Sequence, residues 1–271
     1  RKNMSSLDLK DFLSKENVPD RFIPIGNFSQ ITNLKLDLEI FLTNKGYFSE
    51  VNTKVNRGNW FENNNITNLK VNNATGSLKW FKNFSDLKFL EFEFGYYKSE
   101  MDLESFEFLE NLEELDLSKI NYGDNQKIKN LDFIRKSKKI RKLSLNIYDS
   151  YGDSDNLENL DFLEDLINLE ELSISGLSGN INLDGLLFCR KLHTLSISAN
   201  TYANDKSNNF SFQLLKNCNS LEELSISGLD GKCNIYGKIL DIDGLKDLKK
   251  LKFISLDEVD ISSDGEVFIN K

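Results

Sequence analysis

One pattern of apolar residues recurs along most of the chain. It is apolar-x-x-apolar-x-apolar, where x is any residue. A typical copy is Leu112, Leu115 and Leu117, and successive copies are separated by about 27 residues on average. The nine copies begin at Ile31, Ile66, Leu87, Leu112, Ile140, Leu169, Leu192, Leu221 and Leu251. A unit that repeats with variable insertions is typical of a solenoid, in which stacked coils share one continuous core.

Each copy predicts one strand of a parallel sheet. Its last two apolar residues alternate with polar ones, as in residues 115–118, and this period of two indicates a short strand with one buried face. A second, more loosely spaced apolar cluster precedes most strands, for example Leu131, Phe133 and Ile134. These clusters predict helical or 3-10 turns that carry the chain across the back of the solenoid.

The first 29 residues fall outside the nine copies and predict an N-terminal cap. Ser6 is a suitable N-cap for a short helix in which Leu9, Phe12 and Leu13 share one face. We expect residues 1–29 to shield the first coil from water.

The repeats extend over residues 30–260, and residues 261–271 predict a C-terminal cap or an edge strand. A turn at residues 264–265 is followed by the alternating apolar residues Val267 and Ile269.

Three segments resemble the leucine-rich repeat family, whose core pattern is L-x-x-L-x-L-x-x-N/C. They are LEELDLS from residue 112 and LEELSIS from residues 169 and 221. The resemblance covers about residues 30–260 and implies a right-handed α/β solenoid, with a concave parallel sheet and a convex side of helical or 3-10 turns. The family's final Asn is found here only at Asn200, and residues such as Ile120 and Leu177 stand in its place elsewhere. The resemblance leaves two subclasses open, the cysteine-containing unit and the shorter bacterial-type unit.

Composition excludes several classes of function. The chain of 271 residues has 34 basic and 43 acidic side chains, a net charge of −9 and a pI of about 4.9, which disfavours binding to nucleic acid or anionic lipid. No apolar stretch reaches the roughly 18 residues of a membrane span, and no signal peptide is visible, so we expect no membrane insertion. Three Cys, an odd number, mildly favour a reducing, intracellular compartment.

The same composition leaves little material for catalysis or metal binding. One His and three Cys cannot make a Cys/His zinc cluster together with a disulfide framework, and no phosphate loop or nucleophile elbow is present. Residues 149–156 offer several oxygen atoms but lack the EF-hand spacing, so we interpret them as a solvated insertion loop. We expect no enzyme activity, no cofactor and no metal.

The strands place three rows of side chains, which we call lanes, on the concave face. The outer lane is Asn33, Asn68, Phe89, Glu114, Lys142, Glu171, Thr194, Glu223 and Phe253. The middle lane is Lys35, Lys70, Glu91, Asp116, Ser144, Ser173, Ser196, Ser225 and Ser255. The inner lane is Asp37, Asn72, Glu93, Ser118, Asn146, Ser175, Ser198, Ser227 and Asp257.

Two features of these lanes are candidates for partner binding. The first is the run of Ser in the middle lane, which leaves room for a partner but also simply keeps a sheet soluble. The second is a group of acidic residues at the third and fourth copies, with aromatic residues beside it. Like charges at one sheet spacing repel each other, so such a group points either to a site for a basic partner or to the solvated face of an acidic protein. The candidate residues are Phe89, Glu91, Glu93, Tyr96, Tyr97, Glu114, Asp116, Lys142, Ser144, Glu171, Ser173, Ser196, Glu223 and Ser225.

The sequence therefore predicts a module that binds another protein, one with a basic surface, on the concave face of a solenoid. Two alternatives stay open at this point. The chain could be the recognition part of a larger signalling protein or enzyme, or a structural subunit of a large assembly.

Overall fold

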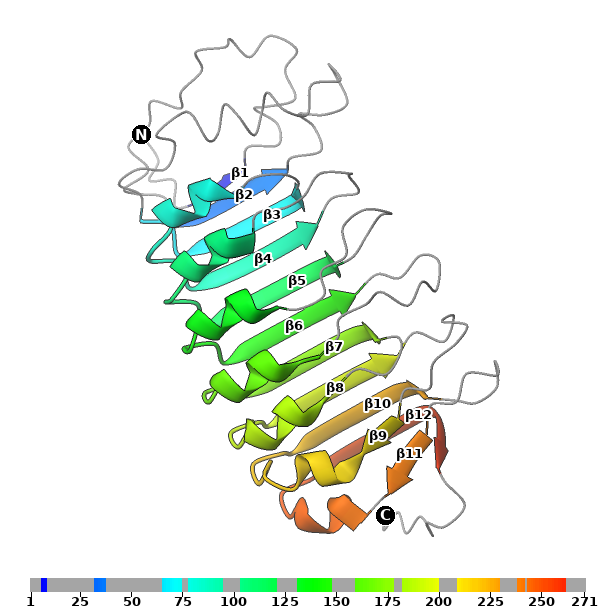
Figure 1. Cartoon of the computed structure of the whole chain (residues 1–271). Coiled ribbons are helices and arrows are strands. Elements are labelled where there is room, and N and C mark those ends of the chain that lie inside the picture. Colours follow the sequence, from blue (N-terminus) through cyan, green and yellow to red (C-terminus); the bar gives the residue numbers. More distant parts are fainter. Residues whose placement is uncertain are drawn as a thin grey trace, which may run out of the picture.

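The computed structural model shows a stack of parallel strands with one short helix beside most of them (Figure 1). It describes residues 6–8, 32–37, 65–74, 78–94, 103–120, 131–147, 159–177, 182–199, 209–229, 238–241 and 243–261. The strands are β1 (Ser6–Asp8), β2 (Asn33–Asp37), β3 (Asn68–Ala74), β4 (Phe89–Phe94), β5 (Glu114–Ile120), β6 (Lys142–Ile147), β7 (Glu171–Leu177), β8 (Thr194–Ala199), β9 (Asn209–Ser211), β10 (Glu223–Leu229), β11 (Lys238–Asp241) and β12 (Phe253–Ile261).

The nine repeat strands lie in one sheet, as the pattern predicts. Within the described residues the sheet has twelve strands in the order β1-β2-β3-β4-β5-β6-β7-β8-β10-β12-β11-β9, and all neighbouring strands are parallel. Equivalent leucines pair across neighbouring coils, for example Leu115 with Leu143 and Leu172 with Leu195. The prediction of a right-handed leucine-rich-repeat solenoid with a parallel concave sheet is confirmed.

The return segments are 3-10 helices, and they form a column beside the sheet (Figure 1). They are η2 (Lys79–Asn83), η3 (Leu103–Phe108), η4 (Asp132–Lys136), η5 (Asp161–Asp165), η6 (Asp184–Phe188), η7 (Phe212–Leu215) and η9 (Asp243–Asp247). The core lies between the sheet and the column of 3-10 helices. Its residues Leu117, Leu160 and Leu224 are fully buried. None of the helices in the described part of the chain is long and apolar enough to cross a membrane.

The N-terminal residues that the structure describes form a strand, so the helix predicted to begin at Ser6 is wrong there. Strand β1 pairs with β2 and places Leu7 beside Leu34. The sequence carries a signal for this strand, because Met4, Leu7 and Leu9 repeat the apolar spacing of the nine copies. The extent of the N-terminal and C-terminal caps stays a prediction, since residues 9–31 and 262–271 lie outside the described residues.

At two of the places where the family has Asn, this chain has a buried apolar side chain. Ile120 and Leu177 stand at the place of the family's Asn, and both are buried. Phe94 and Ile147 are also buried but follow one residue sooner after their strand leucines. The register therefore shifts by one residue where β5 meets β6, as it also does between β3 and β4 and between β7 and β8. Gly176 occupies one of these bulges with φ +78°, a conformation that favours Gly.

The C-terminal end contains a second, shorter set of paired strands, which the sequence pattern does not predict. The first part of β12 pairs with β10, and its last residues, Asp260 and Ile261, pair with β11. Strand β11 in turn pairs with β9, which lies in the connection between β8 and β10. Strand β12 thus joins the concave sheet to strands of the connecting segments at this end of the solenoid (Figure 1).

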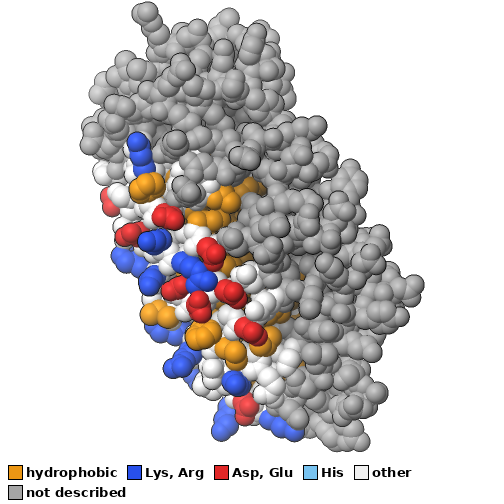
Figure 2. Space-filling view, viewed as in Figure 1, with side chains coloured by type: hydrophobic (Ala, Val, Ile, Leu, Met, Phe, Trp, Pro, Cys, Tyr) orange, Lys and Arg blue, Asp and Glu red, His pale blue; other side chains and the backbone are white. Residues whose placement is uncertain are grey.

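Ion pairs between neighbouring coils run along the edge where the strands begin. Nζ of Lys88 lies 2.9 Å from Glu113, a nitrogen of Arg141 lies 2.8 Å from Glu170, and Nζ of Lys252 lies 2.6 Å from Glu222. Figure 2 shows charges of both signs mixed over the described part of this side of the molecule. Because cations and carboxylates alternate from coil to coil, this edge has no large area of a single sign.

The guanidinium of Arg135 joins two coils on the convex side. It contacts Asp132 of its own helix η4 at 2.9 Å, and Glu164 and Asp165 of η5 at 2.9 and 2.6 Å. These three carboxylates raise the pKa of Arg135, with the hydrogen bond to Asp165 as the largest cause. A cluster of basic residues around residues 135–142 is therefore matched by acidic residues of the next coil.

Candidate binding surface on the concave face

The structure confirms the register of the outer and middle lanes from β2 to β12. In the middle lane Lys35 pairs with Lys70, Lys70 with Glu91, Glu91 with Asp116, and Asp116 with Ser144. The inner lane is interrupted, because the bulges between β3 and β4 and between β5 and β6 break its pairing. The outer and middle lanes therefore form the regular part of the concave surface.

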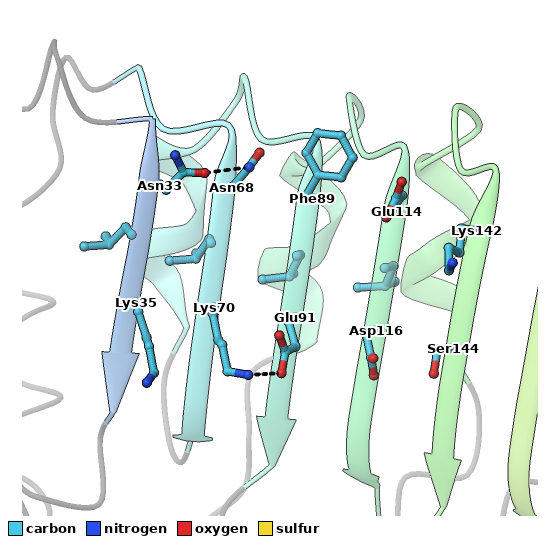
Figure 3. A pocket seen from close by; sticks show the side chains of 14 residues that line it. Asn33, Lys35, Asn68, Lys70, Phe89, Glu91, Glu114, Asp116, Lys142 and Ser144 are labelled. Atoms are coloured by element: carbon cyan, nitrogen blue, oxygen red, sulfur yellow. Dashed lines mark hydrogen bonds and ion pairs between the residues drawn. The ribbon is translucent and has the colours of Figure 1, made fainter. Parts of the chain in front are cut away.

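A shallow hollow of about 420 Å³ lies across β2 to β6, at the end of the sheet where the charged lane residues gather (Figure 3). Leucines of the strands form its floor. Its polar and aromatic lining consists of Asn33, Lys35, Asn68, Lys70, Phe89, Glu91, Glu114, Asp116, Lys142 and Ser144. The structure thus brings together Phe89, Glu91, Glu114, Asp116, Lys142 and Ser144 of the predicted candidates.

The acidic residues of the hollow are flanked by lysines. Lys70 of β3 donates a hydrogen bond to Glu91 of β4 within an ion pair (Figure 3). The next strand places Asp116 directly beside Glu91, so two carboxylates are adjacent in the middle lane. Along the lane the sequence of charges is therefore two cations followed by two anions, and the repulsion expected from the acidic pair is partly offset by Lys70.

Asp116 is half-buried, and its pKa is raised. Burial is the largest cause, and the neighbouring Glu91 adds to it, whereas a hydrogen bond from the Ser144 hydroxyl and the charges of Lys70 and Lys142 lower the pKa. Since burial and Glu91 outweigh the favourable contacts, the ionised carboxylate is held in an unfavourable environment. A cation brought by a partner would relieve this cost.

The outer lane changes from neutral to charged residues along the hollow. Nδ2 of Asn68 donates to Oδ1 of Asn33 at 2.6 Å, and Phe89 follows on β4. Glu114 then pairs in register with Lys142, whose Nζ lies 2.7 Å from Glu171 of β7. Oδ1 of Asn68 is buried and accepts no hydrogen bond from the residues that the structure describes.

The remaining predicted residues lie beyond the hollow or outside the described residues. Glu171, Ser173, Ser196, Glu223 and Ser225 continue the two lanes along β7, β8 and β10, past the hollow. Glu93 lies in the inner lane of β4, opposite Ser118. Tyr96 and Tyr97, and the loop at residues 149–156, lie outside the described residues.

Lys35 and Lys70 are lining residues that the sequence prediction missed. Both stand in the middle lane as it was written from the sequence, next to the acidic residues. The signal was the change of sign along the lane, which becomes visible only when the cations are considered together with the carboxylates.

The thiols are buried, and the possible metal ligands of the described residues are not clustered. Cys189 and Cys218 are free and buried, and burial raises the pKa of each thiol to about 12. Each thiol donates to a backbone carbonyl, Cys189 to Gly185 and Cys218 to Leu186. No cluster of three or more His, Cys, Asp or Glu suited to a metal ion occurs within the described ranges.

Of three comparisons with known proteins, only the one with solved structures found matches. No protein-family model and no curated protein matches the sequence. Among solved structures, the plant peptide hormone receptor RGFR1 in complex with RGF2 has a TM-score of 0.50 at 15% identity, over 90% of this chain and 34% of that one. This chain thus spans about a third of the receptor chain. Internalin C2 of Listeria monocytogenes has a TM-score of 0.43 at 22% identity, over 71% and 81% of the two chains. The Leptospira interrogans LRR protein LIC12759 has a TM-score of 0.47 at 15% identity, over 96% and 68%.

Three observations now bear on the fold: the nine sequence repeats, the parallel sheet in which they pair in register, and the likeness to the plant receptor structure. On these grounds the chain has the fold of a leucine-rich repeat solenoid.

Proposed function

We propose that the chain is a non-enzymatic protein-interaction module whose partner docks on the concave face, at the hollow across β2 to β6. The observation that carries the proposal is the environment of Asp116, a half-buried carboxylate placed beside Glu91. Surface residues that lower the stability of the folded chain are typical of functional sites, where binding or activity is selected at the expense of stability.

Rigidity of the surface supports the same proposal. The lane residues stand on strands whose leucines are buried in the shared core, for example Leu90 and Leu115 beneath the hollow. Their backbone is therefore ordered before a partner arrives, which lowers the entropic cost of association. Phe89 offers an aromatic contact at the rim of the hollow, and aromatic residues are enriched where interfaces gain most of their binding energy.

The solved receptor with the highest TM-score of the three is described as a complex with a peptide hormone. A solenoid of this fold can thus hold a peptide ligand.

A capture experiment with matched charge changes tests the proposal. The wild-type chain, a Glu91→Lys/Asp116→Lys variant and a Glu107→Lys/Glu110→Lys variant are each used to capture proteins from a lysate of the source organism. Glu107 and Glu110 are exposed residues of η3 and the turn after it, so the second variant makes the same change of charge away from the concave face.

We expect the wild type and the Glu107→Lys/Glu110→Lys variant to capture the same partner protein. The Glu91→Lys/Asp116→Lys variant should no longer capture it. Circular dichroism and the unfolding midpoint of each variant serve as controls for folding. Retention by all three chains would contradict docking on the concave face, and loss by both variants would show an effect of net charge alone.

A further inference from the structure

The charges of the hollow are arranged in a fixed order along the axis of the solenoid. The strands β2 and β3 contribute Lys35 and Lys70 to the middle lane, whereas β4 and β5 contribute Glu91 and Asp116. The outer lane is neutral at the β2–β3 end, with Asn33 and Asn68, and carries Glu114 and then Lys142 at the other end. Figure 3 shows Lys35 and Lys70 at one end of the hollow, with the carboxylates next and Lys142 beyond them.

A purely basic partner segment fits only half of this surface. A cation placed over Glu91 and Asp116 gains favourable interactions, but a second cation farther along the segment would face Lys35 and Lys70. Like charges brought together at an interface cost affinity and exclude wrong partners. An acidic side chain at that end would instead meet two ammonium groups.

Phe89 stands between the two charged ends. It belongs to β4, and its neighbours in the outer lane are Asn68 on one side and Glu114 on the other. The leucine floor beneath these residues adds apolar surface at the centre of the hollow. An apolar or aromatic side chain at the middle of a partner segment would therefore find a matching contact there.

The distance between the charged ends sets a spacing in the partner. Three strand-to-strand steps separate Lys35 from Asp116, which corresponds to about 14 Å. An extended chain advances about 3.4 Å per residue, so two side chains on the same face at this distance are about four residues apart. The hollow is shallow, which suits one extended chain better than a helix about 10 Å across.

We infer that the hollow recognises an extended segment of a partner protein in which an acidic and a basic residue stand four residues apart, with an apolar residue between them. The acidic residue lies over Lys35, at one end of the middle lane, and the basic residue lies over Asp116, three strands further along. This inference rests on the proposed function and adds the charge order and the spacing to it.

An array of immobilised 12-residue peptides tests the inference directly. Each peptide carries a central Phe between two charged residues in a Ser/Gly background, and the set varies the separation of the charges from two to eight residues. Acidic–basic, basic–basic, acidic–acidic and uncharged versions are included at each separation. Binding of the fluorescently labelled chain is measured at low salt, where partly exposed charges are least screened.

We expect acidic–basic peptides with a separation of four to bind about fivefold more strongly than basic–basic peptides of equal length. The neutralising variants Lys70→Gln and Asp116→Asn should each reduce binding of the acidic–basic peptides. Lys70→Gln should increase binding of the basic–basic peptides, because it removes a repulsive ammonium group. The unfolding midpoint of each variant is measured as a control. It should be unchanged for Lys70→Gln and raised for Asp116→Asn, which would show that weaker binding does not result from unfolding.

Other outcomes would overturn the inference. Stronger binding of the basic–basic peptides would show that only the acidic half is read, and would leave docking on the concave face intact. No preference over the uncharged peptides would refute recognition of an extended charged segment. The proposed function itself would fail separately, if the captured protein were retained by the Glu91→Lys/Asp116→Lys variant.

Discussion

Truncation of Leu224 tests the strand register on which the whole account rests. Leu224 is fully buried at the centre of β10, where it pairs with Leu195 of β8 and Ile254 of β12. The change to Ala removes three buried carbon groups, each worth about 0.8 kcal/mol, or about 2.4 kcal/mol together. Because the coils on both sides keep their own pairing, the cavity does not close fully, and its cost brings the expected loss to about 2 to 5 kcal/mol.

The adjacent residue provides a matched control. Ser225 lies in the middle lane between Ser196 and Ser255, so Ser225→Ala should change the free energy of unfolding by less than about 0.5 kcal/mol. Both variants are compared with the wild type by urea unfolding, monitored by far-ultraviolet circular dichroism. The dependence of the free energy of unfolding on urea concentration should be the same for all three chains. A Ser225→Ala variant as unstable as Leu224→Ala would refute the assignment of buried and concave positions.

Three further predictions concern the backbone, a carboxylate and the thiols. Gly176→Ala should destabilise the chain by more than about 1 kcal/mol in urea unfolding, because φ is +78° and a Cβ would clash with the backbone oxygen of Ile147 in the neighbouring coil. Asp116→Asn should raise the unfolding midpoint at pH 7. The pKa of Asp116 is higher in the folded state than in the unfolded state, so the wild type loses stability as the pH rises through these two pKa values. The advantage of the Asn variant should therefore vanish at a pH low enough to protonate the carboxyl in both states. The third cysteine, Cys233, lies outside the described residues and is first replaced by Ser. In this Cys233→Ser variant, Cys189 and Cys218 should react with a thiol reagent only as fast as the chain opens, and rapid labelling under native conditions would contradict their burial.

The strands and their register follow from the sequence because burial fixes alternation. A shift of one residue would turn every leucine of a strand toward solvent, so the position of Leu115 or Leu172 determines the neighbours of Asp116 and Ser173. The 3-10 helices follow for the same reason, since clusters such as Leu131 and Ile134 must face the same core.

Other features depend on interactions that the apolar pattern does not contain. The sequence placed Ser6 at the start of a helix, but Ser6–Asp8 pair with β2 as a short strand, while Leu9, Phe12 and Leu13 lie outside the described residues. The bulge at Gly176 belongs to a shift of register between β7 and β8, and the apolar spacing of the two copies does not show this shift.

The candidate site was predicted in part. The lanes gave the acidic residues and Phe89, whereas the ion pair of Lys70 with Glu91 requires the side-chain conformations of both residues. Burial of Asp116 likewise arises from the hollow as a whole, and no single strand encodes it.

Cross-linking of the captured partner tests docking on the concave face most directly. A carbodiimide joins carboxylates to amines without a spacer, and mass spectrometry then identifies the linked residues of a purified complex. The account predicts links from partner lysines to Glu91, Glu114 and Asp116, and none of comparable yield to the exposed convex residues Glu107 and Glu110. Links concentrated on the convex residues, with the concave carboxylates unmodified by the partner, would contradict it.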